Sequence, residues 1–285
     1  MPVTDTPLRY PGGKSQLTPL VVQFLKANDL FYGEYAEPFA GGCGVAMTLL
    51  LNDFVSKIYI NDIDPAIYDF WASVLRHTEE LCERIENAAV NIEERERQRE
   101  IFLRQRSGSQ VDRGFATLFL NRTNRSGILR GGVIGGKEQE GKYKLDCRFN
   151  REDLIRKIKR IANYKDRIAL SRLDAKVFLR TVVPKSIEKT LVNLDPPYFL
   201  RGPELYTNFY KSEDHVDLAK EVRRLKRPWM VTYDDAPEIR KAYAGLPIYG
   251  SSLNYFAQEK RVGCELLVLS PQLVVPAGLA LKKLT

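Results

Sequence analysis

The sequence predicts an α/β fold in which a parallel β-sheet is interrupted by a basic, mainly helical insertion. Strand and helix signals alternate at both ends of the chain, as they do in a parallel sheet whose strands are connected by helices. The alternation stops between residues 77 and 150, where a charged helical stretch precedes a stretch rich in glycine and arginine. The excess positive charge of the chain lies around the same segment. These three observations define the predicted architecture.

The predicted sheet is built from segments on both sides of the insertion. In order, we expect strand 35–39, a glycine turn at 40–44, helix 45–51, strand 55–60 and helix 66–75. After residue 150 we expect helix 151–163, strand 167–173, another helix, strand 191–194, helix 213–227 and strands 229–233 and 265–269. Ser212 is a suitable N-cap for helix 213–227, which has acids in its first turn and bases in its last. We therefore divide the chain into an α/β domain of residues 1–76 and 151–285 and an insertion of residues 77–150.

The insertion combines helix, turns and positive charge. Residues 78–106 are a long, highly charged helical stretch without a strand signal. Glycine pairs in the stretch 114–150 mark turns, which are compatible with a hairpin. Residues 95–160 hold 18 of the 44 Lys and Arg residues but only 8 of the 36 Asp and Glu residues. The rest of the chain is slightly acidic, so the net charge of +8 comes from this segment. Charge concentrated in this way favours a polyanionic partner; the alternative is a merely solvated face.

The composition is that of an ordinary globular protein, with 285 residues of which 44% are hydrophobic and 28% charged. No apolar run reaches the ~18 residues of a membrane span, and the first residues lack the basic and apolar regions of a secretory signal. The four cysteines are far apart and the chain has only two histidines, His77 and His215, so no metal site is expected. Scattered cysteines without a signal peptide predict free thiols and a cytoplasmic protein.

Polar or glycine-rich groups follow the ends of predicted strands, where open parallel sheets bind ligands. After the first strand, the glycines of Phe39-Ala40-Gly41-Gly42-Cys43-Gly44 would let the backbone approach a ligand closely before a helix begins; a structural turn is the alternative. Asp62 lies 21 positions after Gly41, which suits a partner of ribose hydroxyls, although a helix cap would explain it too. Asp174 is placed either to accept from an exocyclic amino group or to cap a helix.

The sequence Asp195-Pro196-Pro197-Tyr198 carries the most specific chemistry. The amino group of a nucleobase is a poor nucleophile because its lone pair is delocalised into the ring. A carboxylate and a backbone carbonyl that both accept from this amino group would favour a pyramidal nitrogen. The two prolines restrict the backbone and would hold both acceptors in one geometry, while Tyr198 supplies a face on which a flipped base stacks. A rigid exit from the strand explains the prolines but not the acid and the aromatic ring together.

Two further features have ordinary structural explanations. His215 lies in the first turn of a predicted helix without a nucleophile beside it, so we expect it to be structural rather than a general base. The tyrosine-rich stretch 205–210 would either cover a flipped base or pack as a loop.

In their order along the chain these motifs resemble a Dam-type DNA N6-adenine methyltransferase of the alpha group. The chain has Leu8-Arg9-Tyr10-Pro11-Gly12-Gly13-Lys14, then Phe39-Ala40-Gly41-Gly42, the basic insertion and Asp195-Pro196-Pro197-Tyr198. Residues 261–270 are similar to the terminal R-x-x-x-E-L-L element of that family. The resemblance spans almost the whole chain. It implies a Rossmann-like S-adenosylmethionine-dependent methyltransferase sheet with an inserted, mainly helical target-recognition domain.

The resemblance also implies the roles of individual residues. It implies S-adenosylmethionine as cofactor, bound by Tyr10, Lys14, Phe39, Gly41, Gly42, Asp62 and Asp174. The stretch from Asn121 to Arg130 is similar to the family's N-R…N-G-L-x-R stretch, which opens a DNA-probing hairpin. The DNA-binding residues implied are Asn121, Arg122, Asn124, Arg125 and Arg130. Ser126 stands where the family usually has asparagine, and the family's phenylalanine-asparagine signature is weak here, so base readout does not transfer.

We therefore predict a site-specific methyltransferase that flips an adenine out of duplex DNA and transfers a methyl group to its N6 amino group, with Asp195, Pro196, Pro197 and Tyr198 as catalytic residues. The alternatives are a cytosine-N4 or RNA-adenine methyltransferase, or a catalytically silent DNA-binding regulator with the same fold. The expected partner is double-stranded DNA, bound by a monomer. A cognate restriction enzyme and a solitary role both remain open, as does the target sequence.

Overall fold

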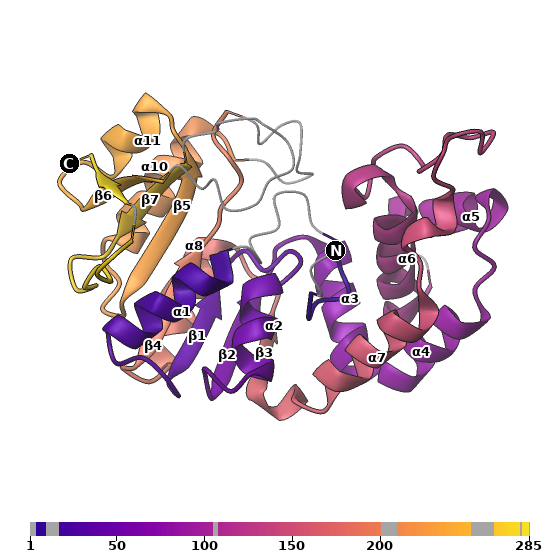
Figure 1. Cartoon of the computed structure of the whole chain (residues 1–285), viewed down its shortest axis with the longest axis horizontal. Coiled ribbons are helices and arrows are strands. Elements are labelled where there is room, and N and C mark those ends of the chain that lie inside the picture. Colours follow the sequence, from indigo (N-terminus) through magenta and orange to yellow (C-terminus); the bar gives the residue numbers. More distant parts are fainter. Residues whose placement is uncertain are drawn as a thin grey trace.

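The computed structural model describes residues 4–9, 17–104, 108–200, 210–251, 265–279 and 281–284. At its centre is an eight-stranded sheet with the order β3-β2-β1-β4-β5-β7-β6-β8 (Figure 1). The strands are β1 (Glu34–Glu37), β2 (Lys57–Asn61), β3 (Ile168–Ser171), β4 (Thr190–Leu194), β5 (Trp229–Asp234), β6 (Ile248–Ser251), β7 (Glu265–Leu269) and β8 (Lys282–Lys283). Strands β1 to β5 are parallel, and β7 runs antiparallel between β5 and β6. This mostly parallel, Rossmann-like sheet confirms the predicted fold class, while β6, β8 and the antiparallel edge were not predicted.

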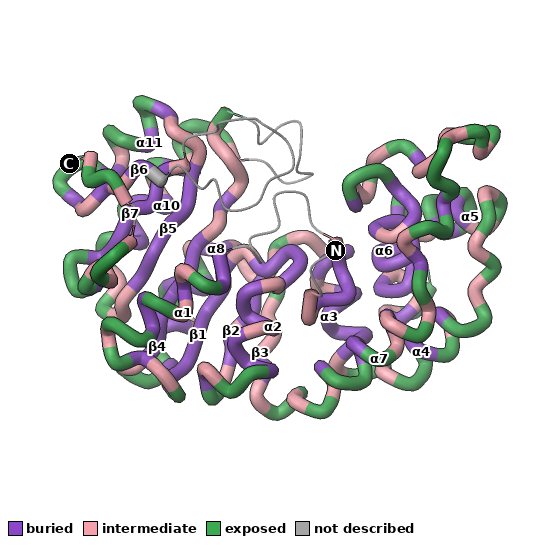
Figure 2. The backbone as a smooth tube through the Cα atoms, in the orientation of Figure 1, coloured by how far each residue is buried: buried purple, intermediate pink, exposed green. Residues whose placement is uncertain are grey.

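Helices cover both faces of the sheet. They are α1 (Thr18–Ala27), α2 (Gly44–Leu51) and α3 (Pro65–Arg76) on one face, and α8 (Ala175–Thr181), α10 (Ser212–Val222) and α11 (Pro237–Ala242) on the other. Neighbouring residues of a strand alternate between the two cores: Tyr35 belongs to the first and Ala36 to the second. The central strands are therefore buried along their whole length, as Figure 2 shows, which is typical of a parallel sheet.

The insertion consists mainly of helices, drawn on the right of Figure 1. They are α4 (Thr78–Asn87), α5 (Ile92–Arg104) and α6 (Gln110–Thr123). A short turn at Leu145–Arg148 then leads to α7 (Arg151–Ala162), which directly follows the insertion. The helical stretch expected over 78–106 is divided into two helices, α4 and α5. The chain leaves the helical conformation at Ala88, and the Oδ1 atom of Asn91 then accepts from the N–H of Glu94 at 2.8 Å, which caps the start of α5.

Helix α6 packs directly on α3. A Cβ atom at Gly114 would lie 2.2 Å from the hydroxyl oxygen of Ser73, so only glycine allows this approach. Apolar side chains of α4 and α6, including Leu81, Phe115 and Phe119, belong to the same core as α1 and α2. The insertion therefore shares a core with the rest of the chain. Its role as a target-recognition domain with the boundaries 77–150 stays a prediction.

The glycine-rich stretch forms a loop rather than a regular hairpin. Among the described residues of 114–150, a single antiparallel bridge joins Asn124 to Val133. The N–H of Arg125 donates to the carbonyl of Gly132 at 2.9 Å and closes the base of the loop. A regular ladder is absent there because the glycine turns, including Gly135 and Gly136 with φ of 84° and 80°, bend the chain soon after the bridge.

Helix α10 begins one residue earlier than expected. Ser212 is its first residue rather than its cap, because the carboxylate of Asp214 accepts from the N–H of Lys211 at 2.9 Å and satisfies the helix start. The helix ends at Val222, short of the predicted residue 227. No helix in the described part of the chain is long and apolar enough to cross a membrane.

Candidate active site

The candidate site lies at the carboxyl edge of the sheet. Strand order reverses between β1 and β4, and ligands of open α/β sheets bind outside the strand ends at such a switch point. Parallel strands all end at the same edge, so the residues after β1, β2, β3 and β4 come together there. The residues at these positions include Phe39, Asp62, Asp174 and Asp195. Because each was expected at or just after the end of a strand, we also expected them to lie at one edge of the sheet.

The glycine loop after β1 is held by two side chains from distant positions. The N–H of Gly41 donates to the carboxylate of Asp62 at 2.8 Å, and the indole N–H of Trp71 donates to the carbonyl of Gly41 at 2.9 Å. Cys43, with φ of 50°, ends the loop in a left-handed conformation and leads directly into α2. The loop therefore presents the start of a helix, whose first N–H groups have no partner within the helix, to the edge of the sheet.

Asp62 joins the glycine loop to the start of α3. Its second carboxylate oxygen accepts from the N–H of Asp64 at 2.9 Å, while Asp64 itself is the N-cap of α3. Burial and, to a smaller extent, the charge of Asp64 raise the pKa of Asp62 to about 7. The helix cap that was the alternative role for Asp62 is thus provided by Asp64. The carboxylate of Asp62 lies at the end of β2, next to the glycine loop.

Asp174 caps α8. Its carboxylate accepts from the N–H groups of Lys176 and Val177 at 2.9 and 3.4 Å. Close to this cap, the ring of Phe39 meets the ring of Tyr210 edge to face, with centroids 5.8 Å apart. Burial first, and then the charge of Asp174, raise the pKa of Tyr210 above its ordinary value. The predicted cofactor residue Phe39 therefore contacts Tyr210, and Asp174 lies close enough for its charge to act on the same tyrosine.

Asp195 leaves β4 in a fixed orientation. Its Oδ1 atom accepts from the hydroxyl of Thr232 on β5 at 2.8 Å. Strand β1 is the other neighbour of β4, and Glu37 lies at its end. Glu37 is buried, and its carboxyl lies 2.9 Å from the hydroxyl of Tyr35. Burial is the main cause that raises the pKa of Glu37 to about 8, and the charge of nearby Asp195 acts in the same direction. Asp195 and Glu37 therefore form a pair of neighbouring carboxyl groups at the switch point.

The residues after Asp195 are bound by two acids of the next strands. The carboxylate of Asp234, at the end of β5, accepts from the N–H of Phe199 at 2.8 Å and from the N–H of Leu200 at 2.7 Å. The hydroxyl of Tyr198 donates to the carboxylate of Glu265 at 2.9 Å. Sequence reasoning missed Glu37, Asp234 and Glu265 as site residues. The signal available for Asp234 was an acid directly after predicted strand 229–233. Glu265 begins predicted strand 265–269, and Glu37 lies inside predicted strand 35–39, shortly before the glycine turn.

His215 lies in an aromatic cluster behind this exit. Its Nδ1 atom is 2.9 Å from the hydroxyl of Tyr233, and its ring packs against Phe199 and Tyr210 at centroid distances of 5.2 and 5.3 Å. Burial lowers the pKa of His215, although the charges of Asp234 and Asp214 oppose this shift. His215 therefore packs against both ends of the segment between Phe199 and Tyr210, in agreement with the structural role expected for it.

Four of the five predicted DNA-binding residues make side-chain hydrogen bonds inside the protein; among them, Nε of Arg125 donates to the carbonyl of Val133 at 3.3 Å. The buried amide of Asn121 accepts from the N–H of Arg9 at 2.7 Å and donates to the carbonyl of Gly127 at 2.9 Å. The guanidinium of Arg122 donates to the carbonyl of Pro7 at 2.8 Å. Asn121 and Arg122 thus hold the N-terminal segment against α6.

Asn124 is fully buried and organises the loop that follows. Its Nδ2 atom donates to the carbonyls of Ile128 and Leu129, and its Oδ1 atom accepts from Arg95 at 2.9 Å. Arg95 is itself buried and also donates to the carbonyl of Gly131 at 3.1 Å. These internal hydrogen bonds do not test the predicted DNA contacts of Asn121, Arg122 and Asn124, which stay a prediction.

Arg125 and Arg130 are exposed on the same loop. The charge of Arg130 acts on Asp64 and lowers its pKa, although burial raises the pKa of Asp64 overall. Arg130 therefore lies near the start of α3.

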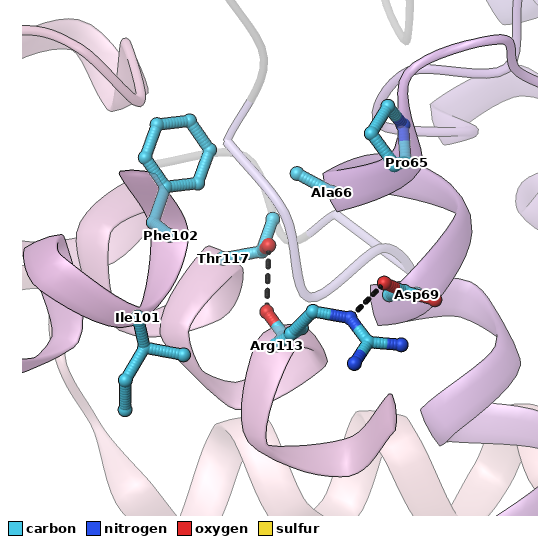
Figure 3. A pocket seen from close by; sticks show the side chains of 7 residues that line it. All are labelled: Pro65, Ala66, Asp69, Ile101, Phe102, Arg113 and Thr117. Carbon is cyan, nitrogen blue, oxygen red and sulfur yellow. Dashed lines mark hydrogen bonds and ion pairs between the residues drawn. The ribbon is translucent and has the colours of Figure 1, made fainter. Parts of the chain in front are cut away.

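A small pocket lies between the start of α3 and helices α5 and α6 (Figure 3). Its polar side is an ion pair in which Nε of Arg113 lies 2.6 Å from the carboxylate of Asp69. Gln110 donates to the other oxygen of the same carboxylate at 3.0 Å. Both oxygens of Asp69 therefore have partners, and its negative charge is compensated by Arg113. Phe102 and Ile101 form the apolar side. This pocket joins the insertion to α3 and is separate from the strand ends that carry Asp195.

Some predicted elements lie outside the described residues. These are Tyr10, Lys14, most of the tyrosine-rich stretch 205–210 and residues 261–264 of the terminal element. Within the described ranges, no group of three or more His, Cys, Asp or Glu side chains is arranged to hold a metal ion.

The strand order, together with a glycine loop and an Asp-Pro-Pro-Tyr exit on either side of the switch point, defines a methyltransferase with a Rossmann-like sheet. The family model described as "D12 class N6 adenine-specific DNA methyltransferase" matches residues 10–255. Because the match covers most of the chain, the chain belongs to this family and is an adenine-specific DNA methyltransferase. The comparison with curated proteins found no match. The family match confirms the resemblance drawn from the motifs.

Proposed function

We propose that the protein uses S-adenosylmethionine as methyl donor and methylates the N6 amino group of an adenine that it flips out of duplex DNA. The observation that carries this proposal is the exit from β4, where Asp195, Pro196 and Tyr198 lie beside the glycine loop at the switch point. Membership of the family supplies adenine in DNA as the substrate.

The residues at the strand ends fit S-adenosylmethionine chemically. The carboxylate of Asp62 suits ribose hydroxyls, and the neighbouring Ile63, which is 48% exposed, offers an apolar side chain to a purine ring. The carboxylate of Asp195 suits the positive sulfonium and ammonium groups, and so does that of Glu37 once a nearby cation lowers its pKa. When bound, this cofactor would supply an electrophilic methyl group. We further assign Tyr10, Lys14, Phe39, Gly41, Gly42 and Asp174 to its binding.

The target base would be held by the residues after β4. The carboxylate of Asp195 and the carbonyl of Pro196 would accept from the N6 amino group, and the ring of Tyr198 would stack on the adenine. Pro197 keeps this segment extended. The amino nitrogen would be brought into line with the methyl group mainly by positioning and by the placement of negative charge. After the transfer, the amino nitrogen loses one proton to solvent.

The insertion would hold the DNA. We assign Arg125 and Arg130 to phosphate or base contacts, and we keep Asn121, Arg122 and Asn124 as residues that order the DNA-facing loop and contact DNA. We further propose that the protein acts as a monomer on cytoplasmic DNA. Sedimentation with and without a short duplex measures this stoichiometry. A cognate restriction enzyme remains an open partner.

The proposed function is tested with purified protein, labelled S-adenosylmethionine and unmethylated plasmid DNA. After digestion to nucleosides, the label should appear in N6-methyladenine, and direct sequencing of the plasmid should map it to one short sequence. Label in N4-methylcytosine, or no label in DNA, contradicts the proposal. A duplex with 2-aminopurine at the mapped adenine should gain fluorescence on binding, because a flipped base is no longer quenched by its neighbours.

We predict that DNA binding weakens steeply as salt rises, and that Arg130→Ala makes this dependence shallower. Each lost phosphate contact should reduce the slope of log affinity against log salt by about one. The measurement is fluorescence anisotropy with a labelled duplex between low and physiological salt. Lys165→Ala, an exposed position at the opposite edge of the sheet, is the matched control and should leave the slope unchanged. An unchanged slope for Arg130→Ala would assign this side chain to another role.

A further inference from the structure

Strands β5 and β7 carry the side chains that bind the Asp-Pro-Pro-Tyr exit. Thr232 donates to Asp195, and Asp234, two residues further along β5, accepts from the backbone beyond Tyr198. Glu265, the first residue of β7, is the partner of Asp234 in the antiparallel register and accepts from the hydroxyl of Tyr198. Three side chains on two adjacent strands therefore hold three different parts of the exit. Thr232 holds the Asp195 carboxylate, Asp234 the backbone after Tyr198, and Glu265 the Tyr198 hydroxyl.

We propose that Glu265 is a positioning residue that acts through the hydroxyl of Tyr198 and holds its ring in the orientation needed to stack on the target adenine. This inference rests on the proposed function, because it assumes that Tyr198 is the stacking side chain.

The backbone around Tyr198 is already restrained without Glu265. Pro196 and Pro197 fix two φ angles before it, and the carboxylate of Asp234 accepts from the two N–H groups that follow it, at 2.8 and 2.7 Å. Hydrogen bonds from N–H groups to a carboxylate are short and stronger than neutral ones. The remaining freedom of Tyr198 is rotation of its side chain.

Glu265 restrains that rotation. The hydroxyl lies at the end of the ring furthest from the backbone, so the bond of 2.9 Å to Glu265 restrains the side chain at its far end. A charged acceptor makes this bond stronger than one to a neutral oxygen. The backbone of Glu265 is held by the pairing of β7 with β5, so the bond to its carboxylate ties the ring to the sheet. Stacking depends on the angle of the ring. Loss of the hydrogen bond to Glu265 should therefore slow the reaction even in a variant that keeps the ring.

The test is a double-mutant cycle on kcat with plasmid DNA that contains the mapped target. Tyr198→Phe keeps the ring and removes the hydroxyl, Glu265→Ala removes its acceptor, and Glu265→Gln keeps an oxygen that can accept. We expect Tyr198→Phe and Glu265→Ala each to lower kcat about tenfold, as expected for loss of one hydrogen bond to a charged group. The double variant should be no slower than either single variant, because both remove the same interaction.

Two further readouts separate positioning from general stability. Glu265→Gln should recover most of the lost rate, and 2-aminopurine fluorescence in the mapped duplex should change in Tyr198→Phe and Glu265→Ala alike, because the ring that contacts the flipped base is no longer fixed. KM for DNA should change less than kcat. Glu238→Ala, an exposed acid on α11, is the control for loss of a negative charge.

The outcomes distinguish this inference from the proposed function. Effects that multiply in the double variant, or an unchanged kcat for Glu265→Ala, overturn the role of Glu265 while methylation by the unmodified protein still supports the function. If the unmodified protein makes no N6-methyladenine, both fail. If Glu265→Ala unfolds, Glu265→Gln in the Tyr198→Phe background decides: any further fall in kcat there contradicts an action through the hydroxyl.

Discussion

Replacement of Asp195 by alanine is expected to lower kcat for adenine methylation by about 10²- to 10³-fold, the usual cost of removing one well-placed electrostatic contact to a transition state. The reason is that the carboxylate, oriented by the hydroxyl of Thr232, would accept from the amino group as positive charge develops on its nitrogen. The measurement is transfer of labelled methyl groups under single-turnover conditions. Affinity for the duplex should change little, because we assign the phosphate contacts to the insertion.

The controls for Asp195 separate its charge from its shape. Asp195→Asn keeps one oxygen that can accept from Thr232 and removes the negative charge, so it should be slowed nearly as much if charge placement dominates. Asp166→Ala removes an exposed acid before β3, at the opposite edge of the sheet, and should methylate at the original rate. Methylation by Asp195→Ala near that rate would falsify the role assigned to Asp195.

Replacement of Glu37 by glutamine is expected to stabilise the ligand-free protein at pH 8.5 and to flatten its dependence on pH. The pKa of this carboxyl rises from an ordinary value of 4.5 to about 8 because the group is buried. The folded protein therefore keeps a proton that the unfolded chain releases as pH rises between these two values. Stability from this group is complete below the unfolded pKa and is lost progressively up to pH 8, by an amount on the order of a few kcal/mol.

Unfolding by urea at pH 5.5, 7 and 8.5 measures this effect. Glutamine carries no titrating group and keeps an oxygen that can accept from the hydroxyl of Tyr35. The pKa of Asp62 is also raised, to about 7. The stability of the Glu37→Gln variant should therefore still fall as pH rises, but by less than that of the unmodified protein. Glu188→Gln, an exposed acid before β4, is the matched control and should follow the unmodified protein. Parallel pH profiles for the unmodified protein and Glu37→Gln would show that Glu37 titrates normally.

Much of the candidate site could be predicted from the sequence because parallel strands share an edge. Asp62, Asp174 and Asp195 each follow an apolar run, and once these runs are strands of one parallel sheet their ends meet without further information. The mostly parallel sheet followed from the same alternation of strands and helices. The break between α4 and α5 was missed because a local cap at Asn91, rather than a glycine or proline, interrupts the charged helical pattern.

The sequence by itself determined the mostly parallel sheet and the order of motifs along its edge, because local hydrophobic patterns and turn residues reflect which segments are strands and where they end. Only the tertiary structure decided which side chains meet across that edge. The bond of Tyr198 to Glu265 joins positions 67 residues apart, and the bond of Asn121 to Arg9 joins positions 112 residues apart. Such contacts depend on strand register and helix packing, which local patterns do not encode. For that reason the structure gave Asn121 and Asn124 internal partners and added Asp234 and Glu265 to the site.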